Sequence, residues 1–540
     1  MSTQWLSLVA AMWLQSISAT NTNFPAYSSQ LKSLLSISQL QLNNLAFASD
    51  AGKILACFSG LAAAHLPLWL TLFIGSVIGF IAYGAQYIML DLLTSPPYSV
   101  FFILSIVAGN SICWINTVCY ILIIQNFPLD MQLSLGLSTS YQGLSAKIYG
   151  DIVEVVYKNS SASEKARGYL LLNSVLPFIV CIMVAPLVAR SSDNIGDSTS
   201  SGGGSSYTCS RKLSTGFVVM FLITTATGIF AVISTSLGDL ILRSSTSTPL
   251  IVLIGISVLV IFFPITVPLV EKIRENVQHK CWIRERRVRS FPADEQAENG
   301  NQALALSVET GAVKHGDNNA VQVDEQETGP WLMIKKLDFW IYFFVYMFGA
   351  TIGLVYLNNL GQIVESRGHS RTTSLVSLSS SFSFFGRLIP CLLEYCFTRA
   401  RYMSSRAGAM AVMMAPMTGA FFILLIDSNI CLHISTAIIG LSTGAISSIA
   451  VSATRELFGA KRFGVNHNIV IINIPIGSII FGSLAAMLYR KNGGFDDDGK
   501  CMGMKCYNTS FIVWGSLCCL GTLLAAILHS RTRKFCSYVN

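Results

Sequence analysis

Long apolar runs, separated by short polar stretches, recur along nearly the whole chain. A helix needs about 20 apolar residues to cross a hydrocarbon core of about 30 Å, so each run predicts one membrane span. The alternating pattern of a membrane β-barrel is absent from these runs. We therefore expect an all-α polytopic membrane protein with about fourteen spans. The predicted spans are 5–27, 41–64, 67–90, 98–124, 131–157, 168–190, 213–237, 249–270, 337–362, 373–397, 403–426, 430–453, 465–489 and 509–529.

Two polar segments interrupt this rhythm. The segment 191–212 is rich in Ser and Gly, which is the composition of a flexible linker. The segment 271–336 begins with basic residues and then becomes acidic and polar, which predicts a disordered loop in the cytosol. The predicted organisation is a six-helix half (1–190), the linker (191–212), two additional helices (213–270), the loop (271–336), a second six-helix half (337–530) and a basic tail (531–540).

Composition supports a protein that faces lipid. Hydrophobic residues make up 52% of the 540 residues and charged residues only 12%, whereas soluble domains carry about 25% charged residues. Lys and Arg beside the spans account for the net charge of +8, so no nucleic-acid partner is expected. The 14 cysteines lie mostly in apolar runs, and no CxxC or Cys/His spacing occurs, so neither a metal nor a cofactor is expected.

The loops give a weak indication of orientation. With the N-terminus inside, most Lys and Arg residues fall on the inner side, largely because of the central loop. The two glycosylation sequons, at Asn159 and Asn508, then both lie outside. Cys501 and Cys506 share one outer loop, where they form either a disulfide or two free thiols. We expect both termini in the cytosol and a location in the plasma membrane or an endomembrane such as the vacuole or ER.

Two motifs in the second half suggest latches between helices. Gly386-Arg387 is followed by Glu394 and a basic turn, and a later inner loop contains Arg455-Glu456. Glycine lets helices approach closely, and arginine can pair with a carboxylate at a helix end. We therefore interpret Arg387 as a gate or latch residue and not as a substrate ligand.

At these residues the chain resembles the major facilitator superfamily, and more narrowly its plant nodulin-like branch with the nuclear-fusion-defective proteins. The stretches that carry the resemblance are Trp13-Leu14-Gln15, Asn23-Phe24-Pro25-Ala26-Tyr27-Ser28, Ser49-Asp50-Ala51-Gly52-Lys53, Asn126-Phe127-Pro128, Gly143-Leu144-Ser145-Ala146, Tyr356-Leu357-Asn358-Asn359-Leu360-Gly361-Gln362 and Glu456-Leu457-Phe458-Gly459. The resemblance implies a monomer with two pseudo-symmetric six-helix halves that work by alternating access. The chain departs from the family pattern at Leu129-Asp130-Met131 and at Gly60 to Pro67, which lacks an Asp-Arg-Gly-Arg core.

Ionisable and amide side chains within the spans are the candidate pathway residues. Asp50 and Lys53 share one helical face, so they form a structural ion pair or serve transport by binding a proton and an anion. Lys147 faces a cavity in our interpretation, and Tyr141 is a weaker candidate for the pathway wall. A lone histidine such as His467, near the start of a span, is more often interfacial than a proton relay. Three amides either grip a polar substrate or bridge helices, namely Asn358, Asn359 and Gln362.

The sequence therefore predicts a secondary active transporter, a symporter or uniporter, for a small polar or anionic solute, coupled to protons or another ion. No GxxxxGK[ST] loop occurs, which argues against direct drive by ATP. No paired carboxylates or Ser/His set occurs in a span, so an enzyme is not expected. The alternative is a non-transporting receptor or scaffold that recruits cytosolic partners through 271–336. Deletion of the loop would abolish the function of such a scaffold, whereas Asp50→Asn and Lys53→Gln would not.

Overall fold

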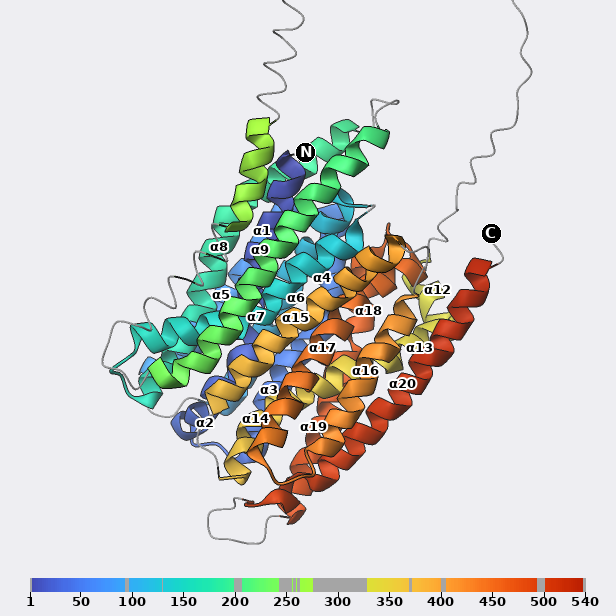
Figure 1. Cartoon of the computed structure of the whole chain (residues 1–540). Coiled ribbons are helices and arrows are strands. Elements are labelled where there is room, and N and C mark those ends of the chain that lie inside the picture. The colour runs from blue at the N-terminus through green and yellow to red at the C-terminus, as the bar shows by residue number, and fades with distance from the viewer. Residues whose placement is uncertain are drawn as a thin grey trace, which may run out of the picture.

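The protein is a bundle of long helices that run roughly along one direction, as the computed structural model in Figure 1 shows. Within the residues that the structure describes, the chain forms helices and no strand. The described residues are 2–92, 97–128, 130–198, 206–241, 255, 259, 263–274, 328–368, 372–399, 405–492 and 501–537.

Two predicted spans of the first half are interrupted helices. The span expected over 5–27 consists of α1 (Ser2–Ser18), a 3-10 turn η1 (Thr20–Asn23) and α2 (Phe24–Leu35). Pro25 explains the break, because proline fits the first turn of a helix but cannot continue one. Likewise, the span over 41–64 consists of α3 (Gln39–Ala51), a 3-10 turn η2 (Gly52–Leu55) and α4 (Ala56–His65). The remaining helices of this half are α5 (Leu68–Leu92), α6 (Tyr98–Asn126), α7 (Met131–Val156) and α8 (Ala162–Ser198).

The region between the halves is only partly described. α8 ends at Ser198 and the first additional helix, α9 (Ser206–Ile241), begins soon afterwards, so both helices extend into the segment that we assigned to a linker. The second additional helix, expected over 249–270, lies mostly outside the described residues, although 263–274 is helical. Most of the charged loop over 271–336 also lies outside them.

The second half repeats the use of interrupted helices. Its first span is divided by a π-helical turn, and its fifth is divided into two helices near Ile472. Its elements are α12 (Pro330–Lys335), α13 (Leu337–Tyr346), η4 (Met347–Thr351), α14 (Ile352–Ser366), α15 (Thr372–Arg399), α16 (Arg406–Ile423), α17 (Asn429–Phe458), α18 (Phe463–Ile471), α19 (Asn473–Asn492), η5 (Met504–Cys506) and α20 (Asn508–Ser537).

Eleven helical segments among the described residues are long and apolar enough to cross a membrane. The chain is therefore an integral multi-pass membrane protein. The expected span over 5–27 is missing from this set because its helix breaks after Ser18. The 26-residue α7 is long enough, but Gln132, Gln142, Lys147 and several hydroxyl side chains make it too polar. These polar positions already suggest that α7 faces other helices more than lipid.

The two halves meet along two seams, and the apolar core continues across them, since Phe384 and Phe463 of the second half belong to the same core as Trp5. The aromatic rings of Trp5 and Phe127 pack with Phe217 of the additional helix α9. In the second half Phe421 packs between Tyr356 and Trp514. The α7–α15 seam joins the halves along one side, and the α4–α18 seam, continued by α3 and α19, joins them along the other.

Glycines let the backbones approach closely at both seams. A Cβ added to Gly143 of α7 would lie 2.6 Å from the backbone nitrogen of Phe384 on α15. A Cβ added to Gly60 of α4 would lie 2.6 Å from the carbonyl oxygen of Gly464 on α18. Both distances are shorter than van der Waals contact, so these seams require glycine. The two chain termini lie at the same end of the bundle (Figure 1).

Candidate functional site

A polar cavity lies between the two halves. Its walls come from both halves and include the interruptions at η1 and η2, which contribute Asn21 and Lys53, and α18, which contributes His467. The cavity has a volume of about 130 Å³, by a measure in which one water occupies about 10–15 Å³. It therefore has the size needed for a small solute and not for a lipid.

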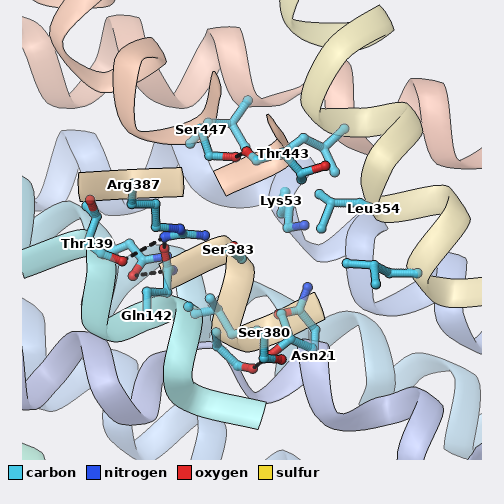
Figure 2. A pocket seen from close by; sticks show the side chains of 18 of the residues that line it. Asn21, Lys53, Thr139, Gln142, Leu354, Ser380, Ser383, Arg387, Thr443 and Ser447 are labelled. Atoms are coloured by element: carbon cyan, nitrogen blue, oxygen red, sulfur yellow. Dashed lines mark hydrogen bonds between the residues drawn. The ribbon is translucent and has the colours of Figure 1, made fainter. Parts of the chain in front are cut away.

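Helical spacing explains why the second half presents a polar wall. Ser379, Ser383 and Arg387 recur every four residues along α15, which places them on one face of the helix. Thr443 and Ser447 are spaced in the same way on α17. Figure 2 shows Ser383, Arg387, Thr443 and Ser447 around the same space. Hydroxyl groups can donate hydrogen bonds to a solute and accept them from it, so the Ser and Thr side chains of this wall can bind uncharged polar groups of a solute.

Arg387 projects from this wall toward the first half. Its Nη1 donates a hydrogen bond to the carbonyl oxygen of Thr139 (3.0 Å) and another to Oε1 of Gln142, both on α7 (Figure 2). Its Nε is buried and has no hydrogen-bond partner. The lining residues include no Asp or Glu, and no described carboxylate lies within ion-pair distance of this guanidinium. Arg387 thus links the two halves and also leaves a positive charge at the cavity without a neutralising carboxylate.

Lys53 brings a second positive charge to the cavity. Its Nζ lies 2.6 Å from Oδ1 of Asp50, three residues earlier, so the two predicted residues form an ion pair. Asp50 is only 2% exposed and is not a lining residue, whereas Lys53 lines the cavity. The hydroxyl of Ser478 on α19 donates to the other carboxylate oxygen, Oδ2, at 2.6 Å. The Asp50–Lys53 pair is therefore linked to α19 of the second half through Ser478.

Two polar residues of α18 complete the site. His467, which we expected at the membrane interface, is instead 3% exposed and lines the cavity, with its ring stacked on Phe463. Its Nδ1 is 3.1 Å from the hydroxyl of Thr454. Asn468 Nδ2 lies within hydrogen-bond distance of three oxygens of the first half, the carbonyl of Ala56 and the hydroxyls of Ser59 and Thr117. The sequence analysis did not select this pair as site residues, and the polar run Asn466-His467-Asn468 at the start of an apolar segment was the available signal.

Comparison with known proteins places the chain in a family. It is 39% identical to the protein NUCLEAR FUSION DEFECTIVE 4 of Arabidopsis thaliana, over 98% of this chain and 89% of that protein. The nodulin-like family model matches residues 4–269, and the model of the NFD4 C-terminal domain matches residues 323–538. The chain belongs to the nodulin-like family. This result confirms the resemblance seen in the sequence.

The fold of this nodulin-like protein is that of the major facilitator superfamily. The structure of the proton:xylose symporter XylE aligns with 96% of this chain and 94% of its own, with a TM-score of 0.55 and 12% sequence identity. At this identity the likeness shows the fold alone. A shorter match joins the chain to a probable transporter, mch1, of Emericella nidulans, with 32% identity over 15% of this chain and 14% of that protein.

The amide residues of the nodulin-like protein lie away from the central cavity. Asn358 and Gln362 line a second cavity, of about 460 Å³, together with Lys32 and Glu365. Gln362 donates to Oδ1 of Asn43 on α3 (2.6 Å) and accepts from the hydroxyl of Tyr507 (2.7 Å). Asn359 donates to the carbonyl oxygen of Val355 in its own helix. Gln362 therefore bridges the two halves, at the end of the bundle opposite the termini.

Two other pathway candidates of the first half lie outside the cavity lining. Tyr141 is fully buried and its ring packs edge-on against Phe384 of α15, in the α7–α15 seam. Lys147 is 3% exposed and its Nζ lies 3.1 Å from a carboxylate oxygen of Asp151, within α7. Among the described residues, no group of three or more His, Cys, Asp or Glu side chains could hold a metal ion.

The candidate latch residues make different kinds of contact. Arg455 Nη1 donates to the carbonyl oxygen of Pro128 (3.3 Å), which joins the halves near the end with the termini. Glu456 pairs instead with Arg406 of its own half at 3.2 Å. Gly386 lies against the backbone of Leu441, so it permits close packing of α15 on α17. The side chain of Glu394 lies outside the described residues.

The loop before α20 of the nodulin-like protein contains a disulfide. Cys501 and Cys506 are bonded, with their Cα atoms 5.9 Å apart. The sequon residues Asn159 and Asn508 lie after α7 and at the start of α20. Asn159 is exposed, so it is accessible to a modifying enzyme.

Proposed function

We propose that this nodulin-like protein is a secondary active transporter that moves a small anion by alternating access. The observation that carries the proposal is Arg387, whose guanidinium borders the central cavity with no carboxylate partner among the described residues. A charge held within a membrane-spanning bundle is costly, so such a group in a membrane protein is a functional candidate by default. A solute carboxylate could take two parallel hydrogen bonds from a guanidinium. Lys53 lines the same cavity, although Asp50 at 2.6 Å balances its charge.

The shape of the site supports alternating access. Both halves line the cavity, and the contacts between them include backbone approaches at glycine, single hydrogen bonds and the packing of Tyr141 on Phe384. Such contacts can break at one end of the cavity while they persist at the other. The chain contains no nucleotide-binding loop, so an ion gradient is the natural source of energy. We further propose that both termini face the cytosol, in the plasma membrane or an endomembrane.

Uptake by reconstituted protein tests this function. The full chain in proteoliposomes is screened with radiolabelled acetate, malate, citrate and inorganic phosphate, with glucose and alanine as solutes without net charge. Arg387→Gln should lower uptake of the transported anion by about 10- to 150-fold, because a hydrogen bond to a charged group contributes about 1.5–3 kcal/mol. Arg387→Lys should retain part of the activity, since it keeps the charge and loses the fork geometry.

Arg531→Gln is the matched control. Arg531 forms an exposed ion pair with Asp338 at 2.6 Å, far along α20 from the cavity lining, so its replacement should leave uptake within about twofold. Size-exclusion profiles and thermal unfolding in detergent establish that each variant folds. Faster transport of glucose or alanine than of every anion would refute the proposal, as would full activity of Arg387→Gln.

A further inference from the structure

The guanidinium of Arg387 has two ways to hold a carboxylate or phosphate with a pair of parallel hydrogen bonds. One fork consists of Nε and Nη2, and the other consists of Nη1 and Nη2. Nε is buried and has no hydrogen-bond partner within the described residues, so a solute in the cavity does not reach the first fork. The fork that remains for a solute is therefore Nη1 with Nη2.

This second fork is already in use on one side. Nη1 donates to the backbone carbonyl of Thr139 at 3.0 Å and to Oε1 of Gln142, as Figure 2 shows. Each Nη has two N–H groups, so both protons of Nη1 are taken. The carbonyl of Thr139 is fixed in the backbone of α7, whereas the side chain of Gln142 can rotate. An anion that takes both nitrogens must therefore displace Gln142.

Arg387 also sets the direction of the hydrogen bonds behind Gln142. A guanidinium only donates, so the oxygen of the Gln142 amide faces it and the NH2 group faces the opposite side. This Nε2 donates to Oδ1 of Asn116 on α6 at 3.3 Å, and the hydroxyl of Ser18 donates to the same oxygen at 3.1 Å. Asn116 also lines the cavity. Gln142 is thus held by Arg387 on one side and by Asn116 on the other.

We propose that Gln142 is an internal surrogate for the solute. Its amide oxygen occupies Nη1 of Arg387 in the empty site, and an arriving anion displaces it. This inference rests on the proposed function. The amide oxygen gives the guanidinium a partner inside the bundle, where an unmet hydrogen bond is costly. The oxygen is uncharged, so a solute anion can replace it, because a hydrogen bond between two charged groups is stronger.

The surrogate also connects solute binding with the contact between the halves. The bond from Arg387 to Gln142 crosses the α7–α15 seam, and displacement of Gln142 removes this side-chain link while the bond to Thr139 remains. Asn116 can keep Nε2 of Gln142 when Oε1 leaves Arg387. The seam is therefore held most firmly when the site is empty, and the solute itself loosens it. After the solute leaves, Gln142 returns to Arg387 and closes the link again.

Equilibrium binding tests the surrogate role. The probe is the radiolabelled anion among acetate, malate, citrate and inorganic phosphate that the wild-type protein takes up fastest, and it is added to the purified full chain in detergent. Gln142→Ala should bind the probe about 10-fold more tightly, because the competing bond to the charged guanidinium is gone and water only partly replaces it. Gln142→Glu should bind no probe at concentrations that saturate the wild type, since its carboxylate pairs with Arg387 and an anion cannot replace it.

Gln86→Ala is the matched control. Gln86 is another amide of the first half, 2% exposed, and it donates to the hydroxyl of Ser105 at 3.3 Å outside the cavity lining. Its replacement should leave the affinity for the probe unchanged. Gln142→Asn is a second variant, which keeps the amide and withdraws its oxygen from Nη1 by one methylene, so it should also bind more tightly than wild type. Size-exclusion profiles identify the variants that fold.

A structure of the wild-type protein with the probe bound covers the case in which no variant folds. Oxygens of the anion should lie at Nη1 and Nη2 of Arg387, and Oε1 of Gln142 should have left Nη1. An anion bound while Gln142 keeps its bond to Arg387 overturns the inference and leaves the proposed function standing. Binding by Gln142→Ala that is no tighter than wild type has the same meaning. If the wild-type protein binds and transports no anion of the panel, both proposals fail.

Discussion

Gly60→Ala tests whether the α4–α18 seam opens during transport. The added Cβ would lie 2.6 Å from the carbonyl oxygen of Gly464 and 2.9 Å from the backbone nitrogen of Val465. Ordinary contact needs about 3.5 Å, so the two helices must separate by roughly 0.9 Å. Both obstacles are backbone atoms, and no side-chain rotation can relieve them. The hydrogen bonds of Asn468 to Ala56 and Ser59 lie in the same seam and would lengthen.

The cost falls only on the conformation in which this seam is closed. Overpacking typically costs about 1–3 kcal/mol, which corresponds to a shift of about 5- to 150-fold in a two-state equilibrium. The population should move toward the state that is open at the seam, and net uptake should fall because the seam must close once in each cycle. Stability should change less than uptake, since the open state avoids the clash.

Double electron–electron resonance between two spin labels measures this shift in population as a change in the distribution of distances between the labels. Labels at His65, at the end of α4, and at Lys461, just before α18, are both at exposed positions in a cysteine-depleted background. Gly60→Ala should enrich the longer distance. Gly419→Ala on α16 is the control, because no atom lies within 4 Å of its added Cβ, and it should leave both distance and uptake unchanged. A Gly60→Ala protein with the wild-type distance distribution and full uptake would show that the seam does not open during transport.

Two further predictions concern the outer loop and the orientation of the chain. Replacing Cys501 and Cys506 by Ser should lower the free energy of unfolding by about 2 kcal/mol, because their short disulfide loop restricts the unfolded chain. Thermal unfolding in detergent measures this change. An unchanged transition temperature would contradict the prediction. If the termini face the cytosol, a glycosidase should increase the gel mobility of protein expressed in plant cells, and Asn159→Gln with Asn508→Gln should abolish the shift. If neither sequon carries a glycan and both termini are exposed on the non-cytosolic face, the proposed orientation is wrong.

Hydropathy predicted the spans well where a helix is continuous and apolar. It did not predict the helix breaks, because a scale of transfer energies assigns similar values to a straight helix and to one interrupted at Asn21 or Gly52. These breaks shape the cavity, since the turns η1 and η2 place Asn21 and Lys53 in its lining. The spacing of Asp50 and Lys53 did predict that they share a face, because three residues make nearly one helical turn.

The position of Arg387 could not be read from its motif. The predicted span over 373–397 placed Arg387 within a helix, and the latch interpretation gave it a carboxylate partner at a helix end. In the structure α15 continues to Arg399, so Arg387 lies about three turns before the helix ends. Its role as a bridge to α7 depends on tertiary packing, because Thr139 and Gln142 belong to the other half.

Both apolar packing and hydrogen bonds connect the halves, since Tyr141 packs against Phe384 in the α7–α15 seam. Within the second half, Phe421 packs with Tyr356 and Trp514 in an aromatic cluster whose separation would expose extensive apolar area. Between the halves, hydrogen bonds cross at both ends of the cavity, from Gln362 to Asn43 at one end and from Arg455 to Pro128 at the other. A bond between neutral groups contributes only about 0.5–1.5 kcal/mol net and one from a charged group about 1.5–3 kcal/mol, because water can replace either partner. One end can therefore open at modest cost while each half stays rigid.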